Sequence, residues 1–311
     1  MIGYTAISRA AQGGKQSFMD ATKFLVANML RSITKKLEIE LLYGQMGYGV
    51  VASAAANVIT ISTAEWAPGI WSGAEGMPIE IRDAAGTTSR GEAVITLVDL
   101  DARTVTVNAI PAGVVATDVI WHKGAYGNEF AGVHKIISNT GTLFNISAAT
   151  YSLWKGNSYS AGSADLSLAK LERAVALAVA KGLDEDIEFM INPKTWANLL
   201  ANEAALRKYD QSYSPQAMEN GAKSIKFYGQ NGAMSLTPSI YVKEGYAYGI
   251  CKKNFMRVGS QEVSFKRPGG NEDFFKELEN NAGVELRVFT DQALFCDAPG
   301  RQILVTAIVN S

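Results

Sequence analysis

The sequence is poor in the residues that most often build metal, redox and disulfide sites. Its 311 residues include two cysteines and two histidines. Cys251 and Cys296 stand alone without Cys-x-x-Cys spacing, so we expect free, buried thiols. His122 and His134 have no third Cys or His at a metal-site interval, which favours structural or surface roles. We therefore expect no metal, no cofactor and no disulfide framework.

Long apolar runs and an excess of one charge are also missing. The N-terminus lacks the basic-then-apolar pattern of a signal peptide, and no run approaches the roughly 20 apolar residues of a membrane span. Basic and acidic residues number 29 and 30, and 47% of residues are hydrophobic. These values exclude a disordered chain and a polyanion-seeking one. We expect a soluble, globular protein of about two domains and of cytosolic origin, with no membrane partner.

Motifs of catalysis are absent. The glycines of GQMGYG follow a helical pattern and lack the Lys-Ser/Thr ending of a phosphate loop, so they predict a hinge at Gly44, Gly47 and Gly49. Residues 184–186 are all acidic but follow a helix end, which favours a solvated turn over a catalytic acid pair. No Gly-x-Ser-x-Gly elbow supplies a nucleophile. We expect no enzyme and assign no catalytic residue.

The best-specified stretch begins with a predicted helix over residues 165–182. Asp165 suits the N-cap, and Gly182 can take the left-handed conformation that ends a helix. At about 1.5 Å per residue this helix would be roughly 24 Å long. Apolar residues recur between the two ends at three-and-four spacing and define a core face: Leu168, Leu171, Val175 and Val179.

A strand and a second helix follow at once. Residues 187–191 alternate between strongly apolar and other side chains, which is the period of a strand with one buried face. Asn192 is a good N-cap and Pro193 fits the first helical position. The second helix should therefore start here and bury Trp196, Leu199 and Leu200.

This order of elements carries a resemblance. A helix that runs into FMINPKTWANLL resembles the junction of spine helix and axial domain in major capsid proteins of tailed bacteriophages, the Hong Kong 97-like fold that encapsulins share. The match is direct over residues 187–200, moderate over 165–311 and loose over 1–43. It implies an α+β fold with the spine helix at 165–182 in a peripheral domain of residues 139–311. It further implies an axial domain at about 187–280 and final strands at 284–309 that return to the peripheral domain.

Residues 50–138 depart from that family's minimal pattern. Five strand-like runs lie here, separated by Gly, Pro, Asp and Asn: residues 58–61, 79–82, 94–98, 104–107 and 119–121. They predict a small β-barrel or β-sandwich in the position of the family's extended loop. Residues 99–103 should form a hairpin turn between two of the strands.

The sequence predicts an arm at residues 1–14 and a helix region after it. Residues 1–14 have too little apolar periodicity to fold alone, so we expect an arm that contacts neighbouring subunits through Ile2, Tyr4 and Ile7. Residues 15–49 form an N-terminal helix region, either one bent helix or two. Because the arm starts at Met1, we expect assembly with a separate scaffolding protein and without cleavage.

The second half of the chain mixes a linker with short strands. Residues 151–162, rich in Ser, Gly and Asn, should be a link back to the core. Strands are expected at residues 240–242, 246–250, 256–258, 284–289 and 303–309.

The resemblance implies a major capsid protein that assembles with itself into pentamers and hexamers of an icosahedral phage head. The head would enclose double-stranded DNA, contacted without sequence readout, and would form in the bacterial host cytoplasm. Scaffolding protein, portal and a decoration protein are the implied partners. One alternative is an encapsulin-type compartment shell. Another is a β-rich glycan-binding or attachment protein, motivated by Trp66, Trp71 and Trp121, although such tryptophans are more often core.

Overall fold

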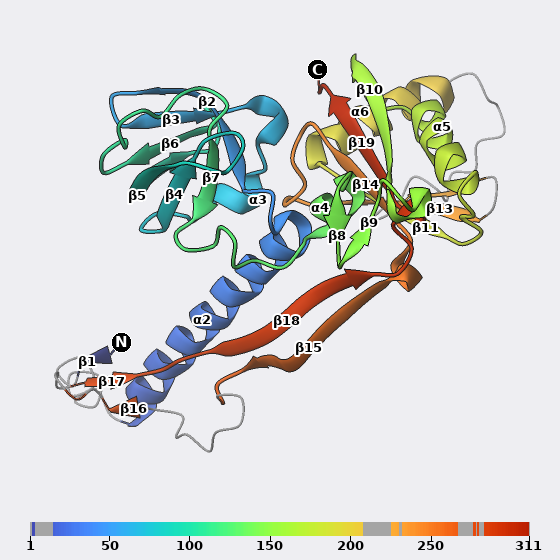
Figure 1. Cartoon of the computed structure of the whole chain (residues 1–311). Helices are drawn as coiled ribbons and strands as arrows, with labels where there is room; N and C mark the ends of the chain where they lie inside the picture. Colours follow the sequence, from blue (N-terminus) through green and yellow to red (C-terminus); the bar gives the residue numbers. More distant parts are fainter. Residues whose placement is uncertain are drawn as a thin grey trace. The chain divides into compact units, whose positions relative to one another are not determined.

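The computed structural model describes residues 2–3, 15–207, 225–229, 232–266, 276–277, 279 and 283–310 (Figure 1). The chain divides into two compact units. One comprises Met1–Glu40 and Arg257–Phe295, and the other comprises Leu41–Met256 and Cys296–Ser311. Within the described residues, no helix is both long and apolar enough to cross a membrane.

The first unit contains most of helix α2 (Lys15–Tyr43) and two small sheets. The helical pattern of the sequence forms one helix of 29 residues. Phe24 is 66% exposed and Leu25 is 40% exposed, so part of the apolar side of α2 is not buried by its own chain. The sheets contain the strands β1 (Ile2–Gly3), β17 (Gly283–Glu285) and β16 (Lys276–Glu277), and the strands β15 (Phe255–Ser264) and β18 (Phe289–Cys296).

The second unit begins with a closed six-stranded barrel, which confirms the barrel alternative for the β-rich region (Figure 1). Its strands follow the order β2, β3, β6, β5, β4, β7 around the barrel. Isoleucine and valine side chains fill it, as the alternating buried positions of β3 and β6 show. The bounds are β2 (Gly49–Ala55), β3 (Val58–Ile61), β4 (Pro78–Arg82), β5 (Ser89–Asp99), β6 (Thr104–Val107) and β7 (Val119–His122).

Five of these strands match the predicted runs, and β2 is the one that the sequence did not reveal. Its sequence, GVVASAA, is rich in alanine and serine and has weak strand propensity. Pairing on both sides stabilises it, with β3 on one side and β7 on the other. The predicted hairpin turn is confirmed, because the Asp99 carboxylate accepts hydrogen bonds from the backbone N–H groups of Asp101 and Ala102.

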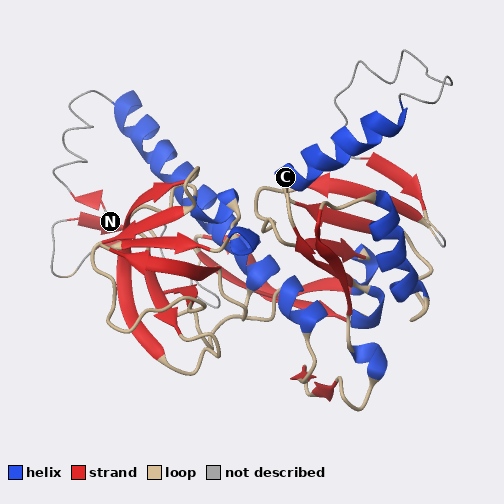
Figure 2. Cartoon of the chain, turned by 90° about the horizontal axis from the view of Figure 1, so that it is seen from above, coloured by secondary structure: helices blue, strands red, loops and turns tan. Residues whose placement is uncertain are grey.

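A mixed six-stranded sheet forms the rest of the second unit (Figure 2). The strand order is β10, β19, β14, β11, β13, β12, with bounds β10 (Asn157–Ala164), β19 (Ile303–Ile308), β14 (Ala247–Ile250), β11 (Ile187–Ile191), β13 (Ala233–Pro238) and β12 (Ile225–Tyr228). Helices α4 (Val133–Ser138) and α5 (Leu168–Val179) contact β10 and β19. The sequence led us to expect β11 in an axial domain and β19 in a peripheral domain. The two strands belong to the same sheet.

Shorter elements connect these parts. They are η1 (Thr63–Glu65), α3 (Pro68–Trp71), β8 (Thr142–Leu143), β9 (Ile146–Ser147), η2 (Ser152–Trp154), α6 (Pro193–Arg207), η4 (Lys252–Asn254) and η5 (Pro299–Arg301).

The helix predicted at 165–182 ends as expected, near Gly182, but it begins later than expected, at Leu168. Ser167, not Asp165, occupies the N-cap position, because the chain before α5 turns to bury Leu166. At the other end Gly182 has φ 91°. The Gly182 N–H donates to the Val179 carbonyl and the Leu183 N–H donates to the Ala178 carbonyl, the pair of bonds that closes a Schellman motif.

The second helix starts as predicted. The Asn192 side chain accepts a hydrogen bond from the Lys194 N–H at 2.9 Å, which caps α6. Leu199 is fully buried, whereas Leu200 is 39% exposed, so the expectation that Leu200 is buried was wrong. Adjacent positions on a helix point about 100° apart, and only one of the two leucines faces the sheet.

Three predictions for the second half need correction. Residues 157–164, read as part of a link, form the edge strand β10, which pairs in parallel with β19 despite its small polar side chains. Residues 240–242 form a turn instead of a strand. The single strand predicted at residues 284–289 is not formed. Instead, β17 ends at Glu285 and a separate strand, β18, begins at Phe289. Backbone pairing to the distant strand β19 makes the first of these segments a strand, and local pattern does not encode that pairing.

Candidate functional site

The turn between β13 and β14, residues 239–246, is the place where distant parts of the second unit meet. Segment 63–71, which contains η1 and α3 of the barrel region, docks on it through the backbone. The Gly69 N–H donates to the Ile240 carbonyl, and the N–H groups of Glu244 and Gly245 donate to the carbonyls of Trp66 and Ala64, each at 2.9 Å. This main-chain ladder attaches the barrel to the six-stranded sheet.

Two glycines permit the close approach of the two segments. A Cβ placed on Gly69 would lie 2.8 Å from the Ile240 carbonyl oxygen, and one on Gly245 would lie 2.7 Å from the Ala64 Cβ. Real Cβ atoms do not approach other atoms so closely, and the Ile240 contact involves backbone that cannot easily shift. Any side chain at Gly69 would therefore push the barrel away from the sheet.

A buried ion pair crosses the same contact. The Lys243 ammonium lies 2.6 Å from a Glu65 carboxylate oxygen, and the Lys243 side chain is only 4% exposed. The same ammonium donates to the Gly47 carbonyl at 3.3 Å and lies 4.4 Å from the centre of the Tyr43 ring. The Tyr246 hydroxyl donates to the other Glu65 oxygen at 2.5 Å. Lys243 thus binds the end of α2 and the barrel at once.

Aromatic hydroxyls complete this arrangement. The Tyr43 hydroxyl donates to the Tyr241 carbonyl and accepts from the Lys243 N–H, both at 2.9 Å. His134 of α4 lies against the ring of Tyr246, and its Nδ1 lies 2.8 Å from the Tyr248 hydroxyl. We call the six residues Tyr43, Glu65, His134, Lys243, Tyr246 and Tyr248 the joint.

Burial controls the ionisation of the joint. Desolvation, and then the nearby Lys243 charge, lower the pKa of His134 to about 4, so the imidazole is neutral at pH 7. Burial opposes ionisation of Glu65 as well, but the Lys243 ammonium and the hydrogen bonds from Lys243 and Tyr246 outweigh it and lower the pKa of that carboxyl. Burial raises the pKa of Tyr43 and Tyr246. The Lys243 ammonium thus faces the Glu65 carboxylate, and the hydroxyls of Tyr43 and Tyr246 stay protonated at pH 7.

The joint was not predicted from the sequence. Tyr43 and Lys243 are separated by 200 positions, and Glu65 and Lys243 by 178. No local spacing connects them. The only available signal was the Tyr246-Ala-Tyr248 alternation, which placed two tyrosines on one face of a predicted strand. With their hydrogen-bonding groups directed at one another, these side chains are arranged to hold segments together rather than to bind a substrate.

The predicted hinge glycines lie beside this joint. Gly44, Gly47 and Gly49 are all buried. Gly47 has φ 76°, and a Cβ on Gly49 would lie 2.9 Å from the Trp71 ring. The glycines allow the chain to turn tightly from α2 into β2. A hinge motion at this turn stays a prediction.

The predicted helix face lies in the core of the sheet. Leu171 and Val175 are buried, and Leu168 and Val179 are partly buried and pack against the same cluster, which also includes Phe189. Of the arm residues, Ile2 belongs to β1 and pairs with Val284 of β17. Tyr4 and Ile7 lie outside the described residues.

The tryptophans that suggested glycan binding are core residues. Trp66 and Trp71 are 1% and 0% exposed and stack with ring centres 6.2 Å apart. Trp121 is 5% exposed and meets the Tyr126 ring edge-on. A sugar-stacking platform requires exposed ring faces, so these side chains do not provide one.

The acidic run at 184–186 is a turn with partners for each residue. Asp184 pairs with Arg301 and Glu185 with Lys253, each at 3.2 Å. Asp186 accepts a hydrogen bond from the Ala233 N–H. No group of three or more His, Cys, Asp or Glu side chains is placed to hold a metal ion in the part of the chain that the structure describes.

Fold and joint together define an α+β protein in which the chain forms a long helix, then a closed barrel, and then a mixed sheet. Among solved structures, the chain is similar to one described as the cyanophage A-1(L) capsid asymmetric unit, with TM-score 0.42 and 10% identity over 59% of this chain and 61% of that one. It is also similar to one described as a virus-like particle from Pyrococcus furiosus, with TM-score 0.28 and 16% identity over 44% of this chain and 47% of that one. The chain thus spans less than two thirds of either. No protein-family model and no curated protein matches the sequence.

Proposed function

We propose that the chain is the subunit of a self-assembling protein shell with the Hong Kong 97-like fold, and that it acts as a structural protein without catalysis. The observation that carries the proposal is the surface that a single subunit leaves uncovered. In the first unit, α2 exposes Phe24 and Leu25, and β15 exposes Val258 by about half. Apolar side chains exposed next to one another on a helix, such as Phe24 and Leu25, can complete their burial against other copies.

The order of the helices and strands along the chain supports the proposed fold. The junction of α5, β11, Asn192 and α6 has the arrangement that the sequence resemblance implied. Two helices are available for the spine. One is α5, with 12 residues. The other is α2, with 29 residues, most of which belong to the unit that also holds most of β15 and β18. Electron microscopy of the assembled particle identifies the spine by its position between neighbouring subunits.

In its fuller form, the proposal is a phage major capsid protein in pentamers and hexamers around double-stranded DNA. Scaffolding protein, portal and a decoration protein are its proposed partners, and the virion is its proposed location. The near balance of 29 basic and 30 acidic residues supports a DNA contact without sequence readout. It also limits repulsion between packed copies. An encapsulin-type compartment is the alternative with the same fold.

Sedimentation and electron microscopy of the full-length chain test the proposal. The chain is expressed alone and with the neighbouring structural genes of its source. Closed icosahedral particles are expected, and an absence of particles under both conditions would refute the shell. Nucleic acid inside the native particle supports the phage head, whereas enclosed protein and no genome supports the compartment.

A further inference from the structure

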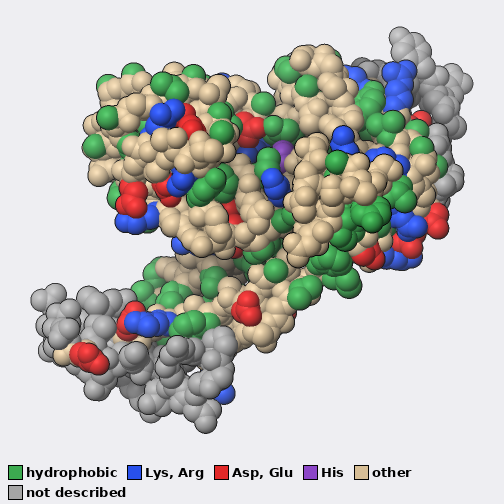
Figure 3. Space-filling model, viewed as in Figure 1, with side chains coloured by type: hydrophobic (Ala, Val, Ile, Leu, Met, Phe, Trp, Pro, Cys, Tyr) green, Lys and Arg blue, Asp and Glu red, His purple; other side chains and the backbone are tan. Residues whose placement is uncertain are grey.

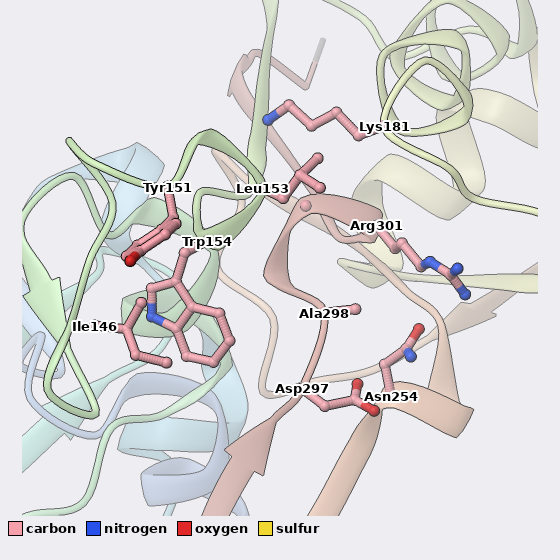
Figure 4. Close-up of a pocket in the computed structure, with 10 residues that line it drawn as sticks. Ile146, Tyr151, Leu153, Trp154, Lys181, Asn254, Asp297, Ala298 and Arg301 are labelled. Carbon is pink, nitrogen blue, oxygen red and sulfur yellow. The ribbon is translucent and has the colours of Figure 1, made fainter.

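A pocket of about 730 Å³ lies between the segment that follows β9 and the loop from β18 to β19 (Figure 4). Figure 4 shows Ile146, Tyr151 and Trp154 on one side and Asn254, Asp297 and Arg301 on the other. Leu153 and Lys181 also line it. Its size is that of pockets that take a small ligand or a few side chains of a partner.

The apolar wall of this pocket is unusually exposed. Tyr151 is 63% exposed and Leu153 is 61% exposed. Trp154 fixes the wall, because its indole N–H donates to the Leu143 carbonyl at 3.0 Å and its ring meets Phe144 edge-on. Figure 3 shows groups of hydrophobic side chains on the face of the second unit that is in view. A fixed, exposed aromatic wall is the kind of surface that binds apolar side chains of a partner.

The rim of the pocket is mainly cationic. The Lys181 ammonium is held at 2.9 Å by the Lys155 carbonyl rather than by a carboxylate. Burial, and then the charge of Lys155, lower the pKa of Lys181. Arg301 is the second cation that lines the pocket, and it pairs with the exposed Asp184. Asp297 is the acidic residue that lines the pocket. A complementary partner carries apolar side chains flanked by carboxylates.

We propose that this pocket receives residues 271–279 of a second copy of this chain, and the proposal rests on the self-assembly proposed above. The sequence of that segment is NEDFFKELE. It combines two adjacent phenylalanines with four carboxylates and one lysine, which matches an aromatic wall with a cationic rim. The N-terminal arm is the competing occupant, since it also carries apolar residues, but its charged residue between positions 1 and 14 is Arg9. The cationic rim favours the acidic segment.

Binding of a labelled peptide with the sequence of residues 271–279 to the purified full-length chain tests the pocket directly. Saturable binding is expected, and Leu153→Ser should weaken it at least tenfold. The matched control is Leu97→Ser on the barrel, where Leu97 is 59% exposed, and this variant should bind like the parent. A peptide with both phenylalanines replaced by serine should not bind. Equal binding to the two leucine variants, or tighter binding of a peptide of residues 1–14, would overturn the proposal.

A charge exchange tests the same contact in assembly. Lys181→Glu and Glu277→Lys should each lower the yield of particles severalfold, and the double variant should regain most of it. Rescue separates a contact from a folding defect, because a merely structural Lys181 would not respond to a change at Glu277. If neither the parent chain nor any variant forms particles, the shell is refuted and peptide binding still decides the pocket. If particles form and the double variant gains nothing, this contact is refuted and the shell stands.

Discussion

Lys243 and Glu65 form a buried pair whose partners belong to the sheet and to the barrel region. We expect Lys243→Met to lower the free energy of unfolding by about 3 kcal/mol, because it leaves the Glu65 carboxylate buried without its cation. The double variant with Glu65→Gln should recover much of that loss. Chemical denaturation of the three variants and the parent measures the coupling.

The control for this cycle is an exposed pair. Lys123 and Glu92 lie 2.6 Å apart, with side chains 52% and 54% exposed. Lys123→Met should change the free energy of unfolding by less than about 1 kcal/mol. If Lys243→Met is equally mild, the joint does not hold the barrel to the sheet.

His134 makes the stability of the joint depend on pH. Its pKa is about 4 in the folded chain and would return to about 6.5 on exposure, so the opened form binds an extra proton between these values. Stability is then unaffected by His134 above pH 6.5 and falls as pH decreases toward 4, by about 3 kcal/mol in all. The lowered pKa of Glu65 adds to the loss once that carboxylate is protonated. Thermal melts from pH 7 to pH 4 measure the slope.

The two histidines of the chain provide a matched comparison. His134→Gln removes the titrating group from the joint and should flatten the slope between pH 6.5 and pH 4.5. His122 lies in β7 of the barrel, so His122→Gln leaves the joint intact. The dependence of stability on pH that arises from His134 should therefore persist in this variant. A His134→Gln variant with the parent's pH profile would contradict this account.

At the scale of elements, the barrel is a candidate for independent folding. Its six strands close on one another, and Ile59, Ile81, Val105 and Ile120 are 0% exposed in its interior. We expect a fragment of residues 46–129 to melt cooperatively, at a lower temperature than the whole chain because it lacks the joint. Residues 133–138 are left out of this fragment, since α4 contacts β10 and β19 of the sheet.

Calorimetry and amide dispersion of the fragment provide the measurement. Ile81→Ser in the same fragment is the control, because a polar group in the barrel interior should abolish the transition. A parent fragment without a cooperative transition would show that the barrel requires the sheet.

The elements themselves were largely predictable where one face is apolar. The β-branched runs that became β3, β4, β6 and β7, and the alternation that became β11, have the local pattern of their strands. Weakly patterned strands were missed, notably β2 with its alanines and β10 with its three serines and one glycine. Their hydrogen-bonded neighbours determine that they are strands, and two of these neighbours, β7 for β2 and β19 for β10, lie far away in the sequence.

The joint was unpredictable for a related reason. A buried lysine in a turn has the same local sequence as an exposed one, and only the approach of Glu65 and Tyr43 distinguishes it. Positions 240–242 illustrate the problem. The apolar run Ile-Tyr-Val resembles a strand, but its carbonyls accept hydrogen bonds from the Tyr43 hydroxyl and the Gly69 N–H. Tertiary contact, rather than propensity, gave this turn its role.

At the scale of the whole molecule, the arm should matter to assembly more than to the fold. The described part of residues 1–14 is β1, which pairs with β17 through Ile2 and Gly3 alone. Deletion of residues 1–14 should leave the melting temperature of the subunit within about 2 °C of the parent, since two paired residues contribute little to stability. Closed particles should form poorly.

The control for the deletion keeps the length of the chain. Ile2→Ser, Tyr4→Ser and Ile7→Ser together remove the apolar side chains of the arm and should reproduce the defect in particle yield. Sedimentation and negative-stain microscopy compare the variants with the parent. Normal particles from the deletion would refute an intersubunit arm, and an unfolded subunit would assign the segment to its own core.

The long separation between the partners of the joint also orders events during synthesis. Barrel contacts span fewer than about 80 positions and can form while the rest of the chain is still being translated. The carbonyls of Ala64 and Trp66, by contrast, receive their donors from residues 244 and 245. The barrel can therefore close while the chain is still on the ribosome. It cannot attach to the sheet until some 180 further residues have been added after Glu65. During that interval the docking surface of segment 63–71 is open to chaperones and to other nascent chains.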